Sequence, residues 1–120
     1  MCFTPRAHTE SVMTKVLFVC GQGRLRSPTA EAVFSEFPGL EVASGGLASD
    51  ADVPLDGELV QWADHILVME TGHRTRLNRK FGRLLRGKRV AVLGIPDPYA
   101  YMQPELVESL KRKVAQHLRL

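Results

Sequence analysis

The 120-residue sequence lacks most of the features that would place it outside the ordinary globular class. It has two cysteines, Cys2 and Cys20, which are too few for a disulfide scaffold, so we expect a reducing, cytoplasmic setting. Its longest apolar run, residues 16–20, is far shorter than the ~20 residues of a membrane-spanning helix. Residues 1–14 hold charged side chains and no apolar core of a secretory signal. With 44% hydrophobic residues and no low-complexity tract, the sequence predicts one folded domain, which is typically ~100–150 residues long.

Positive charge is concentrated in one stretch, although the formal net charge is only +3. Residues 74–89 hold eight basic and no acidic residues: Arg74, Arg76, Arg79, Lys80, Arg83, Arg86, Lys88 and Arg89. The rest of the chain has eight basic against thirteen acidic residues, a balance of −5. Two interpretations are open: the stripe attracts an acidic phosphoprotein or nucleic acid, or it is a solvated helix face. A basic stripe alone does not make a nucleic-acid binder, so we do not predict a nucleic-acid partner.

Apolar runs and helical periods alternate along the chain from Lys15 onward. Residues 1–13 show neither period, and we interpret them as an N-terminal extension or a mis-called start, which leaves 14–120 as the domain. Strands are expected at 16–20, 40–44, 65–69 and 89–94, and helices at 27–36, 54–63, around 77–85 with Gly87 as the terminating residue, and from Pro104. This alternation predicts a single three-layer α/β domain: a four-stranded parallel sheet in the order 2-1-3-4, covered by helices on both faces, as in flavodoxin.

The loop after the first expected strand has the composition of an anion site. It comprises Cys20, Gly21, Gln22, Gly23, Arg24, Leu25 and Arg26, and Ser27-Pro28 then opens a helix. Such a loop can turn its backbone N–H groups inward above the positive helix end, and its two glycines tolerate the backbone angles that this needs. The planar guanidinium of Arg26 suits two phosphoryl oxygens at once. The loop is therefore expected to bind phosphate.

The same positive field acts on the thiol of Cys20. A cysteine near a helix N-terminus and a guanidinium is commonly a thiolate at neutral pH, and thus a nucleophile. The alternative is that Cys20 only ends a buried strand as a small core residue. Ser27 could donate a hydrogen bond to the thiolate or cap the helix. The strand before the loop, the helix after it and the two glycines within it favour the interpretation of Cys20 as a nucleophile.

Residues 16–20, the run Arg26-Ser27-Pro28-Thr29-Ala30-Glu31 and Asp97-Pro98-Tyr99 together resemble the signatures of low-molecular-weight protein tyrosine phosphatases. A group of short bacterial predicted tyrosine phosphatases is more similar than the eukaryotic enzymes. The resemblance implies a four-stranded parallel sheet and hydrolysis of phosphate monoesters through a phosphocysteine, without metal or cofactor. It also implies that Cys20 is the nucleophile, Arg26 the phosphate clamp, Ser27 the thiolate partner and Asp97 the general acid.

The chain departs from this family pattern in its loop. Gly23 stands where members usually have Asn, so a bracing side chain is lost, and Leu25 replaces a second cysteine, so an intraloop disulfide is excluded. Tyr99 and Tyr101 could line an aromatic-substrate pocket or pack on the neighbouring helix. Arg24 could select anionic substrates or be a plain surface residue.

Asp97 must reach the loop to act as an acid. In the expected strand order the fourth strand lies ~10 Å from the first, at ~4.8 Å per strand. The segment 95–103 can span that distance, at ~3.3 Å per residue. The alternative is that Asp97 is only a turn residue before proline.

The favoured function is a cysteine-dependent phosphomonoesterase acting on a phosphorylated protein or a small phosphate monoester, with inorganic phosphate or sulfate able to occupy the loop. A phosphoryl carrier of similar fold remains an alternative, although Arg26 argues against it, and so does a non-catalytic phosphate-binding module. An arsenate reductase would need further cysteines than Cys2. The histidines His8, His65, His73 and His117 lack metal-ligand spacing, so no metal and no membrane partner are predicted.

Overall fold

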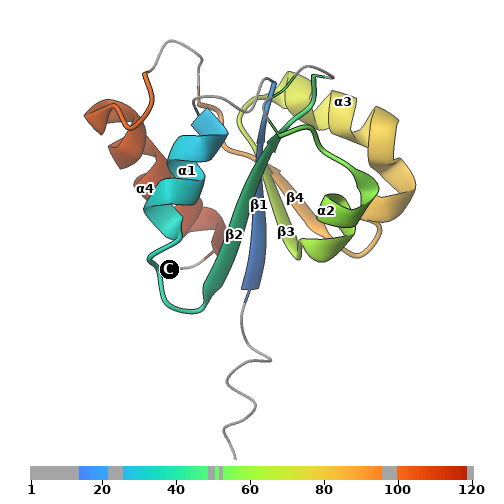
Figure 1. Cartoon of the computed structure of the whole chain (residues 1–120), viewed down its shortest axis with the longest axis horizontal. Helices are drawn as coiled ribbons and strands as arrows, with labels where there is room; N and C mark the ends of the chain where they lie inside the picture. Colours follow the sequence, from blue (N-terminus) through green and yellow to red (C-terminus); the bar gives the residue numbers. More distant parts are fainter. Residues whose placement is uncertain (1–13, 22–25, 49–50, 52, 96–99, 119–120) are drawn as a thin grey trace, which may run out of the picture.

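The computed structural model describes residues 14–21, 26–48, 51, 53–95 and 100–118 and shows a three-layer α/β fold (Figure 1). Its sheet has four parallel strands in the order β2-β1-β3-β4. The strands are β1 (Thr14–Cys20), β2 (Leu40–Gly46), β3 (His65–Val68) and β4 (Arg89–Val92). The predicted fold class and strand order are therefore confirmed.

The central strand β1 is buried on both faces, and residues 16–20 are at most 3% exposed. Val16 and Phe18 belong to the core on one side of the sheet, whereas Leu17 and Val19 belong to the core on the other side. Side chains of a strand alternate between the two faces, so a strand between two helical layers must be apolar at every position. This explains why the run is continuous.

Helices cover both faces of the sheet (Figure 1). On one side lie α1 (Arg26–Phe34) and α4 (Pro104–Leu118), and on the other lie α2 (Gly57–Trp62), α3 (Thr71–Phe81) and the 3₁₀-helix η2 (Gly82–Leu85). Helix α4 buries Leu106, Leu110 and Val114, which recur every four residues on one face. Among the described residues, no helix is both long and apolar enough to span a bilayer.

Several helix ends differ from the sequence-based expectation. Helix α1 begins at Arg26, so Ser27 lies inside the helix, fully buried, and is not its N-cap. Helix α2 begins only at Gly57, because the carboxylate of Asp56 accepts a hydrogen bond from Leu59 N at 2.8 Å. Gly87, by contrast, has the positive φ, 78°, that is expected of a residue that ends a helix.

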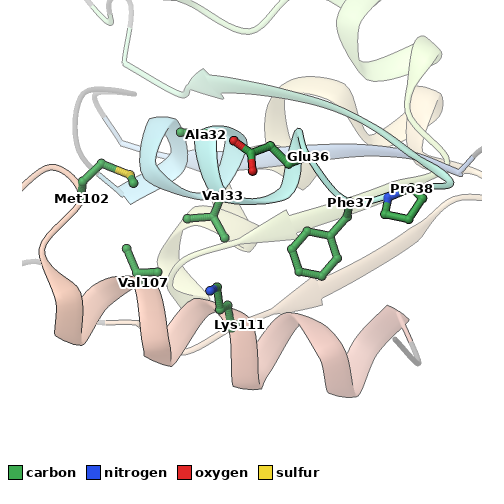
Figure 2. Close-up of a pocket in the computed structure, with 8 residues that line it drawn as sticks. All are labelled: Ala32, Val33, Glu36, Phe37, Pro38, Met102, Val107 and Lys111. Atoms are coloured by element: carbon green, nitrogen blue, oxygen red, sulfur yellow. The ribbon is translucent and has the colours of Figure 1, made fainter.

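An apolar groove runs between the C-terminal end of α1 and α4 (Figure 2). Its lining includes Val33, Phe37, Met102, Val107 and Lys111, and its volume is about 450 Å³. None of the residues that line the groove belongs to the loop that begins at Cys20.

Candidate active site

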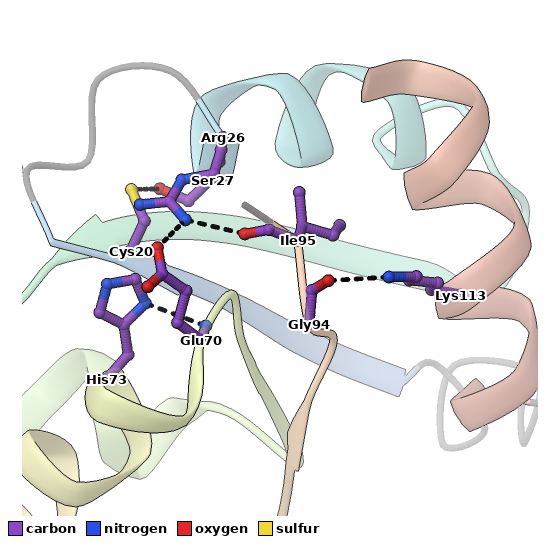
Figure 3. Close-up of polar contacts among 8 residues, drawn as sticks. All are labelled: Cys20, Arg26, Ser27, Glu70, His73, Gly94, Ile95 and Lys113. Atoms are coloured by element: carbon purple, nitrogen blue, oxygen red, sulfur yellow. Dashed lines mark hydrogen bonds and ion pairs between the residues drawn. The ribbon is translucent and has the colours of Figure 1, made fainter. Parts of the chain in front are cut away.

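The carboxyl ends of the parallel strands bring chemically active side chains to one edge of the sheet. Cys20 is the last residue of β1, Glu70 lies two residues after the end of β3, and Ile95 lies three residues after β4. Ligands of open α/β sheets bind at this edge. Polar contacts join all three segments there (Figure 3).

Cys20 and Ser27 close the loop that the sequence marks as an anion site. The Sγ atom of Cys20 lies 3.1 Å from Ser27 Oγ, and both residues are buried. Ser27 Oγ also donates a longer hydrogen bond, of 3.4 Å, to the carbonyl oxygen of Gly45 in β2. The hydroxyl is thus placed between the thiol and a backbone acceptor.

Arg26 is a buried charge, only 6% exposed, with two acceptors on one of its nitrogens. Its Nη1 atom donates to the carboxylate of Glu70, forming an ion pair, and to the carbonyl oxygen of Ile95 at 2.9 Å (Figure 3). Burial of a guanidinium without such partners would cost several kcal/mol. These two acceptors come from different elements of the fold, and together they orient the planar guanidinium.

Glu70 is the N-cap of α3, and its backbone connects it to His73 in the first turn of that helix. Glu70 N donates to His73 Nδ1 at 3.2 Å, so the neutral ring carries its proton on Nε2. His73 is 8% exposed, and its Nε2 lies 3.7 Å from the position that a Cβ on Gly21 would take. The hydrogen bond from Arg26, together with the charge of Arg26, lowers the pKa of Glu70 against a smaller opposing effect of desolvation.

Backbone hydrogen bonds fix the start of the loop. Leu47 N donates to Cys20 O at 3.0 Å, and Ala48 N donates to Gly21 O at 2.8 Å, which extends the pairing of β1 with the chain after β2. Lys80 Nζ in turn donates to Leu47 O at 3.1 Å. Both ends of the segment from Cys20 to Ser27 are therefore held by other elements.

The structure brings together three of the predicted site residues, Cys20, Arg26 and Ser27, with Gly21 beside them. The other loop residues and two predicted residues after β4 lie outside the described part of the chain: Gln22, Gly23, Arg24, Leu25, Asp97 and Tyr99. Tyr101 is 53% exposed in the turn before α4. The next residue, Met102, donates its N–H to Thr29 Oγ1 of α1 at 3.0 Å, which ties this turn to the helix that carries Arg26 and Ser27.

Two side chains of the site, Glu70 and His73, were missed by the sequence analysis as functional residues. A usable signal existed for Glu70, because it is the first charged residue after the apolar run of the third strand and so belongs to the same edge as Cys20. His73 then follows at the third helical position, one turn from Glu70. Within the described ranges, no group of three or more His, Cys, Asp or Glu is placed to hold a metal ion.

Comparisons with known proteins point to one family of phosphatases, although no family model matches the sequence. A protein-arginine-phosphatase of Geobacillus stearothermophilus is 31% identical over a stretch that covers 56% of this chain and 62% of that protein, less than two thirds of its length. A solved protein tyrosine phosphatase is similar with a TM-score of 0.68 at 28% identity, covering 87% of this chain and 92% of the other. A solved Cys-to-Ser variant of the YwlE arginine phosphatase carries a phosphorylated active-site serine. It is similar with a TM-score of 0.68 at 27% identity, covering 88% of this chain and 96% of the other.

Proposed function

We propose that the chain is a member of the low-molecular-weight protein tyrosine phosphatase family, and that it is a phosphatase that works through a phosphocysteine on Cys20. The observation that carries the proposal is the closed loop between Cys20 and Ser27, whose side chains lie 3.1 Å apart with the buried guanidinium of Arg26 beside them. A nucleophile and a phosphate-binding cation thus belong to one short segment. The phosphorylated serine of the related YwlE variant supports the same chemistry.

In the first step the Cys20 thiolate attacks phosphorus, so that an S–P bond forms as the bond from phosphorus to the leaving group breaks. The guanidinium of Arg26 holds two equatorial oxygens, and the N–H groups at the start of α1 face the negative charge. Asp97 gives its proton to the leaving group. In the second step water attacks phosphorus and gives its proton to Asp97, the S–P bond breaks, and inorganic phosphate and the thiolate are released.

The position of Ser27 suits both protonation states of Cys20. When Cys20 is a thiol, its S–H can donate to Ser27 Oγ while the hydroxyl donates to Gly45 O, 3.4 Å away. When Cys20 is a thiolate, the hydroxyl can turn and donate to Sγ instead. Ser27 is therefore proposed to stabilise the thiolate both as attacking group and as leaving group in the second step.

Chain connectivity supports Asp97 as the acid, although Asp97 lies outside the described residues. The carbonyl of Ile95 accepts a hydrogen bond from Arg26, so the chain after β4 passes beside the phosphate-binding cation. Two peptide units keep the Cα of Asp97 within about 7.6 Å of that of Ile95. A carboxyl group at that position is within reach of a leaving group in the loop.

The substrate is proposed to be a phosphorylated protein side chain. The relatives are described as a protein-arginine-phosphatase and a protein tyrosine phosphatase, so phosphoarginine and phosphotyrosine are the two candidates. Parallel assays on one peptide sequence that carries either residue would decide between them.

The proposal is tested with para-nitrophenyl phosphate and with the two phosphopeptides. Wild type is expected to turn over, Cys20→Ser to be inactive, and Asp97→Asn to be slowed by ~10²-fold or more, because proton transfer typically contributes ~10²–10⁴-fold. Cys2→Ser is the matched control and is expected to keep full activity. Turnover by Cys20→Ser, or a stable phosphocysteine that releases no phosphate, would contradict the proposal.

A further inference from the structure

The outward face of α3 and η2 is basic and begins near the edge of the sheet where Cys20 and Arg26 lie. We call Arg76, Arg79, Lys80 and Arg83 the basic face; all four are exposed. Helix α3 starts directly after Glu70, which contacts Arg26, and runs away from the loop along one side of the sheet (Figure 1). A partner bound in the loop would therefore lie at one end of this face.

The charge arrangement does not serve the stability of the helix. Arg76 and Arg79, and Arg76 and Lys80, have the i,i+3 and i,i+4 spacings at which like charges repel and destabilise a helix. No Asp or Glu lies between residues 71 and 96 to compensate them. Within the described part of the chain, Arg76, Arg79 and Arg83 form no ion pair. Such uncompensated arginines suit an external partner with carboxylates, which the guanidinium fork binds well.

The C-terminal part of the basic face is concave. A hollow of about 490 Å³ lies where α3 passes into η2, and Arg79, Lys80 and Arg83 contribute to its lining. Lys80 already donates to Leu47 O, so the two arginines are the groups that present charge to a ligand. The hollow can receive an acidic side chain between them.

We propose that this hollow binds carboxylate side chains of the phosphorylated protein substrate, an inference that rests on the proposed function. Arg79 and Arg83 come 9 and 13 residues after Glu70, which corresponds to about 14–20 Å at ~1.5 Å per residue. An extended peptide spans that distance in about four to six residues at ~3.3 Å each. The substrate therefore carries Asp or Glu about four to six positions from the phosphorylated residue.

A polypeptide fits this surface better than a nucleic acid. Single-stranded nucleic acid is bound by stacking of bases on aromatic side chains. Among the described residues of α3 and η2 no aromatic ring is exposed, because Phe81 is half-buried against the core. Arginines without aromatic neighbours are suited to carboxylates.

The test uses phosphopeptides built on whichever residue, phosphotyrosine or phosphoarginine, the enzyme turns over faster. Glu or Gln occupies positions four to six on the N-terminal side in one series and on the C-terminal side in another. Wild type is expected to prefer the Glu peptide of one series by about fivefold in kcat/KM, since exposed ion pairs are individually weak. The preference should shrink below twofold at about 1 M salt, where the Debye length is ~3 Å.

Variants assign the preference to the hollow. Arg79→Glu/Arg83→Glu is expected to lose or reverse it, whereas the matched control Lys111→Glu/Arg112→Glu, on the exposed side of α4, keeps it. Arg79→Gln/Arg83→Gln covers the case in which charge reversal impairs folding. Turnover of para-nitrophenyl phosphate should be the same in all four proteins.

The outcomes separate this inference from the proposed function. If wild type did not turn over para-nitrophenyl phosphate, the proposed phosphatase function itself would be refuted. Normal turnover without any preference for the Glu peptides would refute only the docking inference. If a 20-mer single-stranded DNA bound in a salt-dependent way that Arg79→Glu/Arg83→Glu abolished, and no peptide preference were found, the ligand of the hollow would be a nucleic acid and the docking inference would be wrong.

Discussion

Glu70→Gln should weaken catalysis by loosening Arg26. The carboxylate of Glu70 and the carbonyl of Ile95 both accept from Nη1 of this buried guanidinium, and so they fix its orientation toward the loop. The glutamine side chain has nearly the same shape and keeps an acceptor oxygen, but it loses the charge. The substitution thus isolates the electrostatic part of one contact.

The size of the effect follows from the difference between two kinds of hydrogen bond. A hydrogen bond to a charged group contributes about 1.5–3 kcal/mol, and a neutral one about 0.5–1.5 kcal/mol. The Glu70 side chain is 46% exposed, so water screens part of the gain. A loss of about 1–1.4 kcal/mol corresponds to a five- to tenfold lower kcat/KM.

The negative charge of Glu70 also has an opposing effect on substrate binding. The carboxylate also repels the phosphate dianion, so its neutralisation could strengthen substrate binding. This repulsion acts over a longer distance through a half-exposed region, whereas the contact with Arg26 is direct. The loss of orientation is therefore expected to dominate, and inhibition by inorganic phosphate should weaken together with kcat/KM.

The assay compares wild type, Glu70→Gln and Glu41→Gln with para-nitrophenyl phosphate at neutral pH. Glu41 is exposed near the start of β2, far from the carboxyl edge of the sheet, so it gives the same charge change without the contact. A kcat/KM for Glu70→Gln within twofold of wild type, or above it, would refute the argument.

Three further results are expected. Ser27→Ala should slow hydrolysis of the phosphoenzyme about tenfold, because the hydroxyl 3.1 Å from Sγ is lost, and an unchanged burst and steady-state rate would speak against it. Gly45→Ala should lower the free energy of unfolding by about 1 kcal/mol or more in urea denaturation, because its Cβ would lie 2.5 Å from Leu55 Cδ2 and 3.3 Å from Val53 O, whereas Gly72→Ala, with open space, should raise it. The ionised form of Glu70 stabilises the fold above pH 4.5, its ordinary pKa, and this stability is lost as the pH falls through the lowered folded-state pKa. The difference in the free energy of unfolding between wild type and Glu70→Gln should therefore shrink toward pH 3, and a difference that stays constant with pH would contradict this prediction.

Much of the fold follows from local sequence patterns. The apolar run at residues 16–20 is buried on both faces, as its composition predicts, and Pro104 begins the last helix. The order 2-1-3-4 followed from the alternation of strands and helices, because right-handed crossovers leave few arrangements of four parallel strands. The positive φ of Gly87 likewise agrees with its predicted terminating role.

The role of Ser27 shows where local patterns were insufficient. Ser-Pro commonly opens a helix with serine as the cap, and the sequence analysis left both uses of the hydroxyl open. In the structure Ser27 lies within α1 and its hydroxyl contacts Cys20 and Gly45 instead. A serine cap and a buried serine near a thiol look the same in sequence, because the choice depends on what the neighbouring strand places there.

A loop with cysteine, glycines and arginine between a buried strand and a helix is a local feature, so the sequence alone is sufficient to predict an anion site at residues 20–27. The contacts that hold Arg26, in contrast, depend on how distant segments of the chain fold together. Its acceptors on Glu70 and Ile95 come from positions 44 and 69 residues further along the chain. They meet Arg26 because parallel strands deliver their carboxyl ends to one edge of the sheet, and no pattern within a single segment records which residues face each other there.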